Sequence, residues 1–483
     1  MVGRPRPLPP RRAAVPALCG LAAGVTAIVL QPVVLADDAA ISLRYAARLA
    51  DGAGLTYNDH ERVLGASNPL FVLLVASGRL LGVDTEQAAR AIAVAAFVAV
   101  VVVAVELGTL LSSRLGGALA GVLLTTMGGF RGQALSGMEV GLSAALGLGA
   151  ILAAARRRPV AAGVLVGLAL LTKADALTLA LAVVVACVVG HRRVRPMLIA
   201  AAAVVLPWLA YSWVAYGSMV PHAVDAKLDM SGPPFDPLWM LKLLGWPAWL
   251  LAGLAVALTM RLWPERDPSR RLVLTALWGW FLLHFLAYST IDLGAPYPWY
   301  GALLVPPLTI MGAAFVGRDV AEPAAIGPVP GRPALLLTVA MVALLALPGA
   351  SDAARQLRPG GRPLPYERVL VDNRDAGVAV ARLARPGEVV RSCYGWVGYA
   401  ALGQPVDDPC LLNSVRSPGA PTWQVVEGVE MAGQLDRFRL VSSFATACRD
   451  EADRPWFALL VRRGSAADRR VSGLTGDERP CRR

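Results

Sequence analysis

The stretch VPALCGLAAGVTAIVLQPVVLADDAAISLRYAARLADGAG, residues 15–54, joins a bilayer-length apolar block to two adjacent carboxylates. The block, residues 13–35, is longer than the core of a typical signal peptide. No clear small-residue cleavage site follows it, although Ala36 is small. We therefore predict a retained first transmembrane helix, with Asp37 and Asp38 at the membrane surface where it ends.

The rest of the chain repeats this apolar pattern. Of its 483 residues, 56% are hydrophobic, and the mean hydropathy is +0.54. Residues 159–190 form a long apolar stretch interrupted at Lys173 and Asp175, which predicts a tight turn between two shorter helices. We predict an α-helical polytopic membrane protein with about eleven transmembrane helices. The other blocks are residues 88–111, 115–130, 138–155, 196–216, 239–260, 270–290, 299–317 and 333–350.

Basic clusters between the blocks predict the orientation. The net charge of +12 is concentrated in short Arg-rich loops, which are typical of the cytoplasmic side and argue against a nucleic-acid partner. The N-terminus is then cytoplasmic, and residues 36–87 form a first external loop of a plasma-membrane protein. Residues 69–83 are short for a span, and crossing there would move two Arg loops outside, so we expect an interfacial helix. The clusters are Arg4, Arg6, Arg11 and Arg12; Arg156–Arg158; Arg192, Arg193 and Arg195; and Arg261, Arg266, Arg270 and Arg271.

The composition changes after residue 350. Residues 1–350 are predicted to form the transmembrane domain, and residues 351–483 a polar, extracytoplasmic α/β or α+β domain with short strand-like runs. Cys19 and Cys187 lie in apolar spans, where we expect them to fill the core. The C-terminal domain can form up to two disulfides, whose pairing is open, among Cys393, Cys410, Cys448 and Cys481.

The Asp37–Asp38 pair is the leading candidate for chemistry. Two carboxylates at the membrane surface could serve as a general base toward an acceptor hydroxyl, or one of them could bind a divalent metal. The structural alternative is that they cap the following helix. That helix is predicted over Ile41–Leu49, with Arg44 and Arg48 on one face, and it ends at Gly52–Gly54. We favour a functional role for the pair.

Further candidates lie in four later external turns. Glu139 begins a span, where an acid also has a favourable helix-dipole interaction. Lys173 and Asp175 can bind substrate or neutralise each other. The side chains of all these external turns would converge on one outward-facing cavity in a helical bundle. A transporter more often places ionisable groups near the membrane midplane. The remaining candidates are His222, Asp225 and Lys227, where a cation could hold a lipid-linked phosphate, and Tyr297, Trp299 and Tyr300, which an aromatic belt also explains.

The first loop resembles a known family. The opening Asp37–Asp38, the pair Arg44–Tyr45, the turn from Gly52 to Asn58, Glu61–Val63, and Ser67 to Leu70 match bacterial polytopic (GT-C) glycosyltransferases of the arabinofuranosyltransferase type. The resemblance extends over roughly residues 15–310 and includes the SGME, LTKADAL and Pro221–Lys227 segments. No Walker phosphate loop, HExxH zinc motif or nucleophile elbow is present.

The resemblance implies a GT-C fold and an inverting transfer in which Asp37 or Asp38 activates the acceptor. The donor would be a polyprenyl-phosphate sugar, and the acceptor a cell-envelope glycan or lipid on the outer face. Ala40, Lys173–Ala174 and His222 depart from the family pattern, so the sugar stays open between arabinofuranose and another pentose or hexose. The alternatives are a lipid-linked glycan transporter or flippase, and a non-catalytic envelope assembly protein. The resemblance implies substrate binding by Arg44, Tyr45, Tyr57, Asn58, Glu61, Arg62, Glu139, Lys173, Asp175, His222, Lys227, Trp299 and Tyr300.

Overall fold

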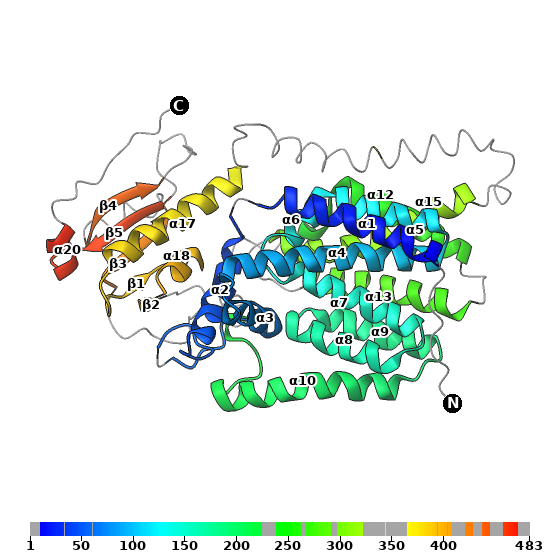
Figure 1. Cartoon of the computed structure of the whole chain (residues 1–483), viewed down its shortest axis with the longest axis horizontal. Helices are drawn as coiled ribbons and strands as arrows, with labels where there is room; N and C mark the ends of the chain where they lie inside the picture. Colours follow the sequence, from blue (N-terminus) through cyan, green and yellow to red (C-terminus); the bar gives the residue numbers. More distant parts are fainter. Residues whose placement is uncertain are drawn as a thin grey trace.

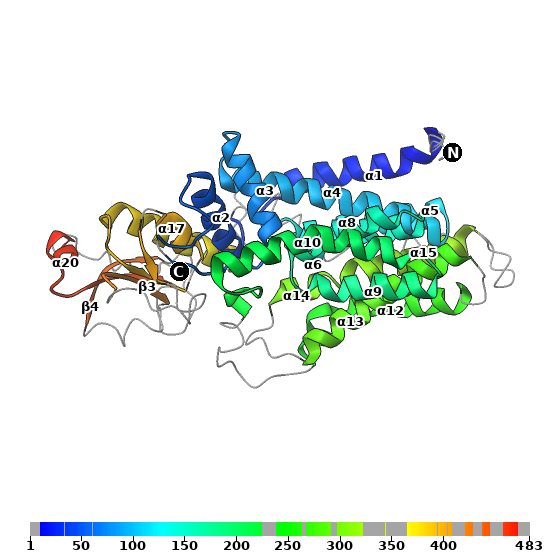
Figure 2. The same ribbon diagram turned by 90° about the horizontal axis from the view of Figure 1, so that it is seen from below.

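The computed structural model places a long helical bundle at one end of the molecule and a small mixed sheet at the other (Figure 1). The segment predicted to form the first external loop lies between them (Figures 1 and 2). The structure describes residues 10–32, 34–59, 61–224, 238–262, 267–290, 297–321, 343, 365–393, 395–402, 404–407, 421–427, 437–444 and 457–471.

The bundle contains five helices, among the described residues, that are long and apolar enough to cross a membrane. They are α4 (Thr85–Leu111), α10 (Val194–Tyr216), α12 (Trp239–Leu262), α13 (Pro268–Thr290), and the continuous segment Pro298–Arg318, which contains α14 (Pro298–Ala302) and the start of α15 (Val305–Ala321).

Shorter apolar helices complete the bundle. Helices α8 and α9 are separated at Lys173–Asp175, so the predicted turn is confirmed. The polytopic helical fold class is also confirmed, whereas residues 333–350 lie outside the described chain and the number of spans stays a prediction. The shorter helices are α1 (Pro10–Val29), α5 (Arg114–Thr126), α6 (Gly128–Ala134), α7 (Val140–Ala155), α8 (Pro159–Thr172) and α9 (Ala176–Val189).

The predicted external loop contains two helices, α2 (Asp37–Ala50) and α3 (Pro69–Leu80). Helix α3 packs against α2 and α4, and Pro69 occupies its first turn, where a missing N–H costs nothing. Its side chains Leu73, Leu74 and Leu80 are 43%, 39% and 71% exposed. A short helix with one buried face and one exposed apolar face suits the predicted interfacial position.

The basic turns gather at the end of the bundle away from the sheet (Figure 1). Arg156 pairs with Glu106 at 2.5 Å, and Arg192 donates to the Ser269 hydroxyl at 3.0 Å. Arg270 donates to the carbonyl oxygen of Leu110, the penultimate residue of α4, at 3.2 Å. Positive charge is thus concentrated at the end opposite the candidate carboxylates.

The C-terminal segment packs helices on a five-stranded sheet of order β2-β1-β3-β5-β4. Strands β2, β1 and β3 run parallel, whereas β3–β5 and β5–β4 are antiparallel. Cys393 is disulfide-bonded, and its partner lies outside the described residues, while Cys19 and Cys187 are free thiols. The elements are α17 (Pro365–Leu383), β1 (Val390–Arg391), α18 (Gly395–Ala400), β2 (Val406–Asp407), β3 (Trp423–Glu427), β4 (Phe438–Phe444), β5 (Phe457–Arg462) and α20 (Ala466–Val471).

Candidate active site at helix α2

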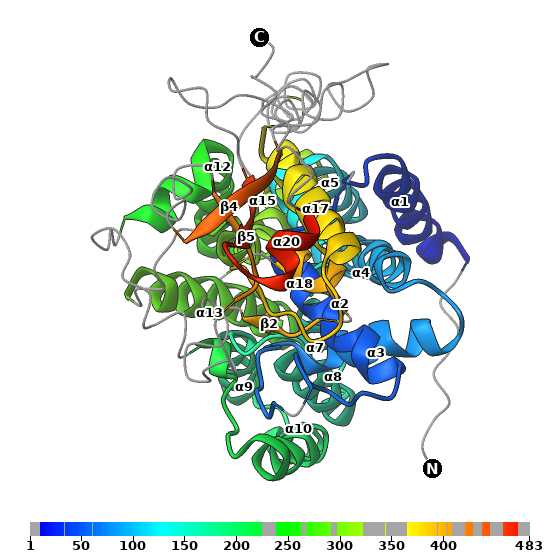
Figure 3. The same cartoon turned by 90° about the vertical axis from the view of Figure 1, so that its left-hand side faces the viewer.

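Helix α2 lies between the C-terminal segment and the bundle, beside α18 (Figure 3). Successive residues of a helix point about 100° apart, so Asp37 and Asp38 project from different faces. Asp37 shares a face with Ile41, Arg44 and Arg48, and Asp38 shares one with Ser42 and Tyr45. Each face meets a different part of the molecule.

Asp37 contacts the C-terminal segment. Its carboxylate accepts a hydrogen bond from the side-chain amide of Asn373 at 2.7 Å. It also accepts from the backbone N–H groups of Gly395 at 2.9 Å and Trp396 at 3.1 Å. Burial raises the pKa of Asp37 to about 6; the Gly395 hydrogen bond opposes this shift and the charge of Asp38 adds to it. Asp37 does not cap α2, because the N-cap is Ala36 and no side chain caps that helix end.

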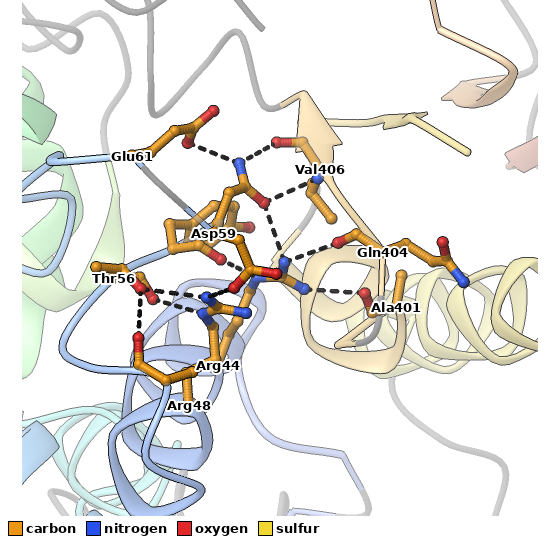
Figure 4. A network of polar contacts seen from close by, with 11 residues as sticks. Arg44, Arg48, Thr56, Asp59, Glu61, Ala401, Gln404 and Val406 are labelled. Atoms are coloured by element: carbon orange, nitrogen blue, oxygen red, sulfur yellow. Dashed lines mark hydrogen bonds and ion pairs between the residues drawn. The ribbon is translucent and has the colours of Figure 1, made fainter. Parts of the chain in front are cut away.

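Arg44 is fully buried on the same face (Figure 4). A guanidinium has five N–H donors, and all five are used within the protein. Burial lowers the pKa of Arg44 to about 10, so the group stays charged at neutral pH. This geometry favours a structural role over substrate binding. The acceptors are the carbonyl oxygens of Tyr57 (2.7 Å), Gly398 (2.5 Å), Ala401 (3.0 Å) and Gln404 (3.0 Å), and the Asn58 side-chain oxygen (3.1 Å).

Asn58 joins the same network to strand β2 (Figure 4). Its side-chain amide donates to the carbonyl oxygen of Val406 at 2.8 Å, and its side-chain oxygen accepts from the N–H of Val406 at 2.9 Å. The second amide hydrogen reaches Glu61 at 2.8 Å. Asn58 therefore pairs with Val406 as a neighbouring strand would, and Glu61 is drawn into the same interface.

The other motif residues order the first loop. The Tyr45 hydroxyl donates to the carbonyl of Val63 at 3.0 Å and accepts from the N–H of Gly65 at 2.9 Å. The Arg44 guanidinium lies over the Tyr57 ring, with its central carbon 4.8 Å from the ring centroid. Both tyrosine side chains are fully buried, so they support the loop.

Two further candidates lie near the end of this loop. Arg62 is exposed. The N–H of His222 donates to the Leu64 carbonyl at 2.8 Å, and the His222 Nδ1 accepts from the N–H of Leu64 at 3.1 Å. His222 thus fixes the first loop to the segment that follows α10. Lys227 lies outside the described residues.

The other face of α2 leads to a buried polar network in the bundle. The Ser42 hydroxyl, one turn after Asp38, hydrogen-bonds the Asn68 side chain at 2.9–3.1 Å. Asn68 donates to Glu139 at 2.7 Å, and the Lys173 ammonium donates to the second Glu139 oxygen at 3.1 Å. The Glu139 carboxylate is therefore held by two donors, the Asn68 amide and the Lys173 ammonium.

Asp175 extends the network to α13 and the aromatic turn that follows it. It lies 3.9 Å from the Lys173 ammonium and accepts a hydrogen bond from the Tyr288 hydroxyl at 2.6 Å. The Tyr288 ring stacks on that of Tyr300 at 4.5 Å, and Tyr297 stacks on Trp299 at 4.5 Å. Lys173 lies 5.7 Å from the Tyr300 ring centroid. The structure thus brings together Glu139, Lys173, Asp175, Trp299 and Tyr300, whereas the outward-facing cavity stays a prediction.

Sequence reasoning missed several members of this site. Asn68 and Ser42 connect the first loop to Glu139, and Tyr288 and His284 come from the interior of an apolar helix. Polar side chains inside apolar helices are a usable signal for such positions. Asn373 gave no signal, because it lies in a domain without a recognised motif.

Among the described residues, no group of three or more His, Cys, Asp or Glu side chains is arranged to hold a metal ion. A metal at Asp37 or Asp38 therefore stays an untested expectation.

The whole arrangement matches solved membrane enzymes. ArnT from Cupriavidus metallidurans, bound to undecaprenyl phosphate, superposes with a TM-score of 0.61 over 94% of this chain and 98% of ArnT, at 14% identity. The oligosaccharyltransferase of Archaeoglobus fulgidus superposes with a TM-score of 0.58 over 93% of this chain and 76% of that protein, at 13% identity. Both are GT-C proteins. The chain has the GT-C fold.

The GT-C likeness concerns the fold, and the narrower arabinofuranosyltransferase type stays a prediction. The A. fulgidus enzyme in complex with an inhibitory peptide and a dolichol-phosphate gives a TM-score of 0.57 over 88% of this chain and 70% of that protein, at 13% identity. No protein-family model matches the sequence, and a comparison with curated proteins finds no significant match.

Proposed function

We propose that this GT-C protein is a membrane glycosyltransferase that moves a sugar from a polyprenyl-phosphate donor to a hydroxyl of a cell-envelope acceptor. The observation that carries the proposal is the division of the two aspartates by α2. The Asp37 carboxylate accepts three hydrogen bonds from the C-terminal segment. Asp38 projects from the other face of α2, which packs toward the polar network of Glu139 and Lys173. The structural match to ArnT with its bound undecaprenyl phosphate supports the donor class.

Asp38 is the general base in this proposal. Its carboxylate takes the proton of the acceptor hydroxyl as that oxygen attacks the anomeric carbon. The bond from the anomeric carbon to the phosphate oxygen breaks, and polyprenyl phosphate leaves with the bonding pair. A single displacement inverts the configuration, and the proton remains on Asp38 until solvent removes it.

The buried network suits the sugar better than the phosphate. Lys173 faces two carboxylates, Glu139 and Asp175, so the three side chains carry one negative charge in excess. Excess negative charge disfavours a phosphate but stabilises the positive charge that develops on a sugar ring during transfer. We infer that Glu139 and Asp175 lie beside the donor sugar, and that cations such as Lys227 bind the donor phosphate.

The proposal extends to orientation. The C-terminal segment, Asp38 and the aromatic turn lie at the end opposite the basic turns, and short basic loops are cytoplasmic. The disulfide at Cys393 supports an exported C-terminal domain, because structural disulfides persist in oxidising compartments. The site therefore belongs to the outer face of the plasma membrane.

The test is transfer by the purified protein in detergent from a panel of polyprenyl-phosphate pentoses and hexoses, with linkage analysis of envelope glycan from a deletion strain. Asp38→Asn should lower transfer by about 1000-fold or more while the protein stays folded, because the proton acceptor is lost. Asp37→Asn is the matched control and should retain measurable transfer. Full transfer by Asp38→Asn would refute the base assignment. An unchanged glycan with donor lipid accumulating on one leaflet would favour a flippase instead.

A further inference from the structure

The start of α2 is held from two directions. From the bundle, the Ser136 carbonyl accepts a hydrogen bond from the N–H of Ala36 at 2.8 Å. From the C-terminal segment, the Trp396 indole donates to the Leu35 carbonyl at 3.0 Å, and Asn373 donates to Asp37 at 2.7 Å. The residues on both sides of Ala36 are therefore fixed by contacts from far along the chain.

These contacts replace a local cap. An uncapped helix start leaves its first N–H groups without side-chain partners, and the first turn frays easily. The N-cap residue of α2 is Ala36, whose side chain cannot bond the first N–H groups, so the tertiary contacts of Ala36 and Asp37 help to hold the first turn. Asp38 lies in that turn, and its carboxylate moves with it.

The contact with the C-terminal segment is close as well as polar. A Cβ atom on Gly395 would lie 2.2 Å from the Asp37 carbonyl oxygen, and one on Gly398 would lie 2.2 Å from the Tyr57 hydroxyl. Asn373 is 2% exposed, and among the described atoms its side-chain oxygen has no hydrogen-bond partner. Among the described residues, the Asn373 side chain therefore makes one hydrogen bond, the one that it donates to Asp37.

We propose that Asn373 is a positioning residue for the reaction and that the α17–α18 segment of the C-terminal domain holds the base in place through Asp37. The proposal rests on the function above, in which Asp38 is the base. Small errors in the placement of a reacting group cost large factors in rate, so a contact one residue from the base affects turnover without touching substrate.

The test is a reciprocal exchange of the two side chains. Asn373→Asp places a second carboxylate against Asp37, and Asp37→Asn removes the charge that Asn373 meets. We expect each single variant to lower kcat by about tenfold or more, with the KM for donor within about twofold of wild type. The double variant Asp37→Asn/Asn373→Asp removes the facing carboxylates but sets the new amide group at position 37 against one of the two backbone N–H donors, so its kcat should lie above that of Asn373→Asp and below that of wild type.

Asp375→Asn is the matched control, because Asp375 is exposed on the same helix α17 and should leave kcat unchanged. Thermal midpoints and size-exclusion profiles of all variants show whether the fold is intact. Should Asn373→Asp fail to fold, Asn373→Ala, which removes the contact without adding a charge, decides the question through the same kcat and KM. Wild-type kcat in the folded Asn373 variant overturns the positioning role. That result leaves the proposed function standing as long as wild type transfers the sugar and Asp38→Asn is strongly impaired. Absence of transfer by the wild-type protein from every donor overturns the function itself.

Discussion

Replacing Arg44 with lysine tests whether this residue binds substrate or supports the structure. Lysine keeps the charge but has three donors instead of five, so at least two of the five hydrogen bonds of Arg44 are lost. A hydrogen bond to a charged group contributes about 1.5–3 kcal/mol, which gives about 3–6 kcal/mol for two. Because the acceptors include Gly398, Ala401 and Gln404, the loss falls on the contact between α2 and the end of α18.

The assay is hydrogen–deuterium exchange of the purified protein, read at residues 395–402, together with the thermal midpoint and the KM for donor. We expect Arg44→Lys to expose these amides to exchange and to lower the midpoint, with turnover falling as the segment loosens. Arg62→Lys is the control. Because Arg62 is exposed in the same loop, this variant should change neither the amide exchange nor the thermal midpoint. A raised KM with wild-type exchange and midpoint would refute this reasoning and return Arg44 to substrate binding.

Three further perturbations test other parts of the site. Because the pKa of Asp37 is raised to about 6 in the fold, its stabilising contribution is present below pH 4 and lost as the pH rises through 6. The stability of wild type relative to Asp37→Asn should therefore fall by about 1 kcal/mol between pH 5 and pH 7 in unfolding curves, and a constant difference would contradict the assignment. Gly395→Ala should loosen the docked segment, seen as faster proteolysis of the C-terminal domain, while Gly129→Ala, with open space around it, should not. Lys173→Met should destabilise the protein by about 3 kcal/mol or more in unfolding curves, because the Glu139 carboxylate would remain buried without its cation; a wild-type midpoint would show that the pair is dispensable.

Much of the membrane domain could be predicted from local pattern. Apolar blocks, their charged flanks and the interruption at Lys173 and Asp175 gave helices with ends close to those observed, because bilayer thickness and burial constrain sequence locally. The interfacial placement of residues 69–83 was predicted from the short length of the apolar run and from the Arg loops, and it fits the exposed leucines of α3. The convergence of Glu139 with Lys173 followed once the helices were assumed to bundle.

The partners of the motif residues could not be predicted in this way. Asn373 is 336 positions from Asp37, and Gln404 is 360 positions from Arg44. Nothing in the local pattern around Asp37 or Arg44 distinguishes a side chain that meets substrate from one that meets a distant backbone. Charge and motif therefore singled out one loop but could not separate the residues that contact the C-terminal segment from those that face the bundle.

The angle between two neighbouring side chains on α2 has an evolutionary consequence. Positions 37 and 38 are adjacent in the chain, but under the proposed function selection acts on docking of the C-terminal segment at position 37 and on transfer at position 38. Among related sequences, an exchange at position 37 should be accompanied by changes at positions 373 and 395, whereas position 38 should tolerate no exchange while transfer is maintained. Under the proposed function, a lineage that has lost transfer should show the reverse: position 38 changes first, and the acid at 37 persists for as long as the domain stays docked.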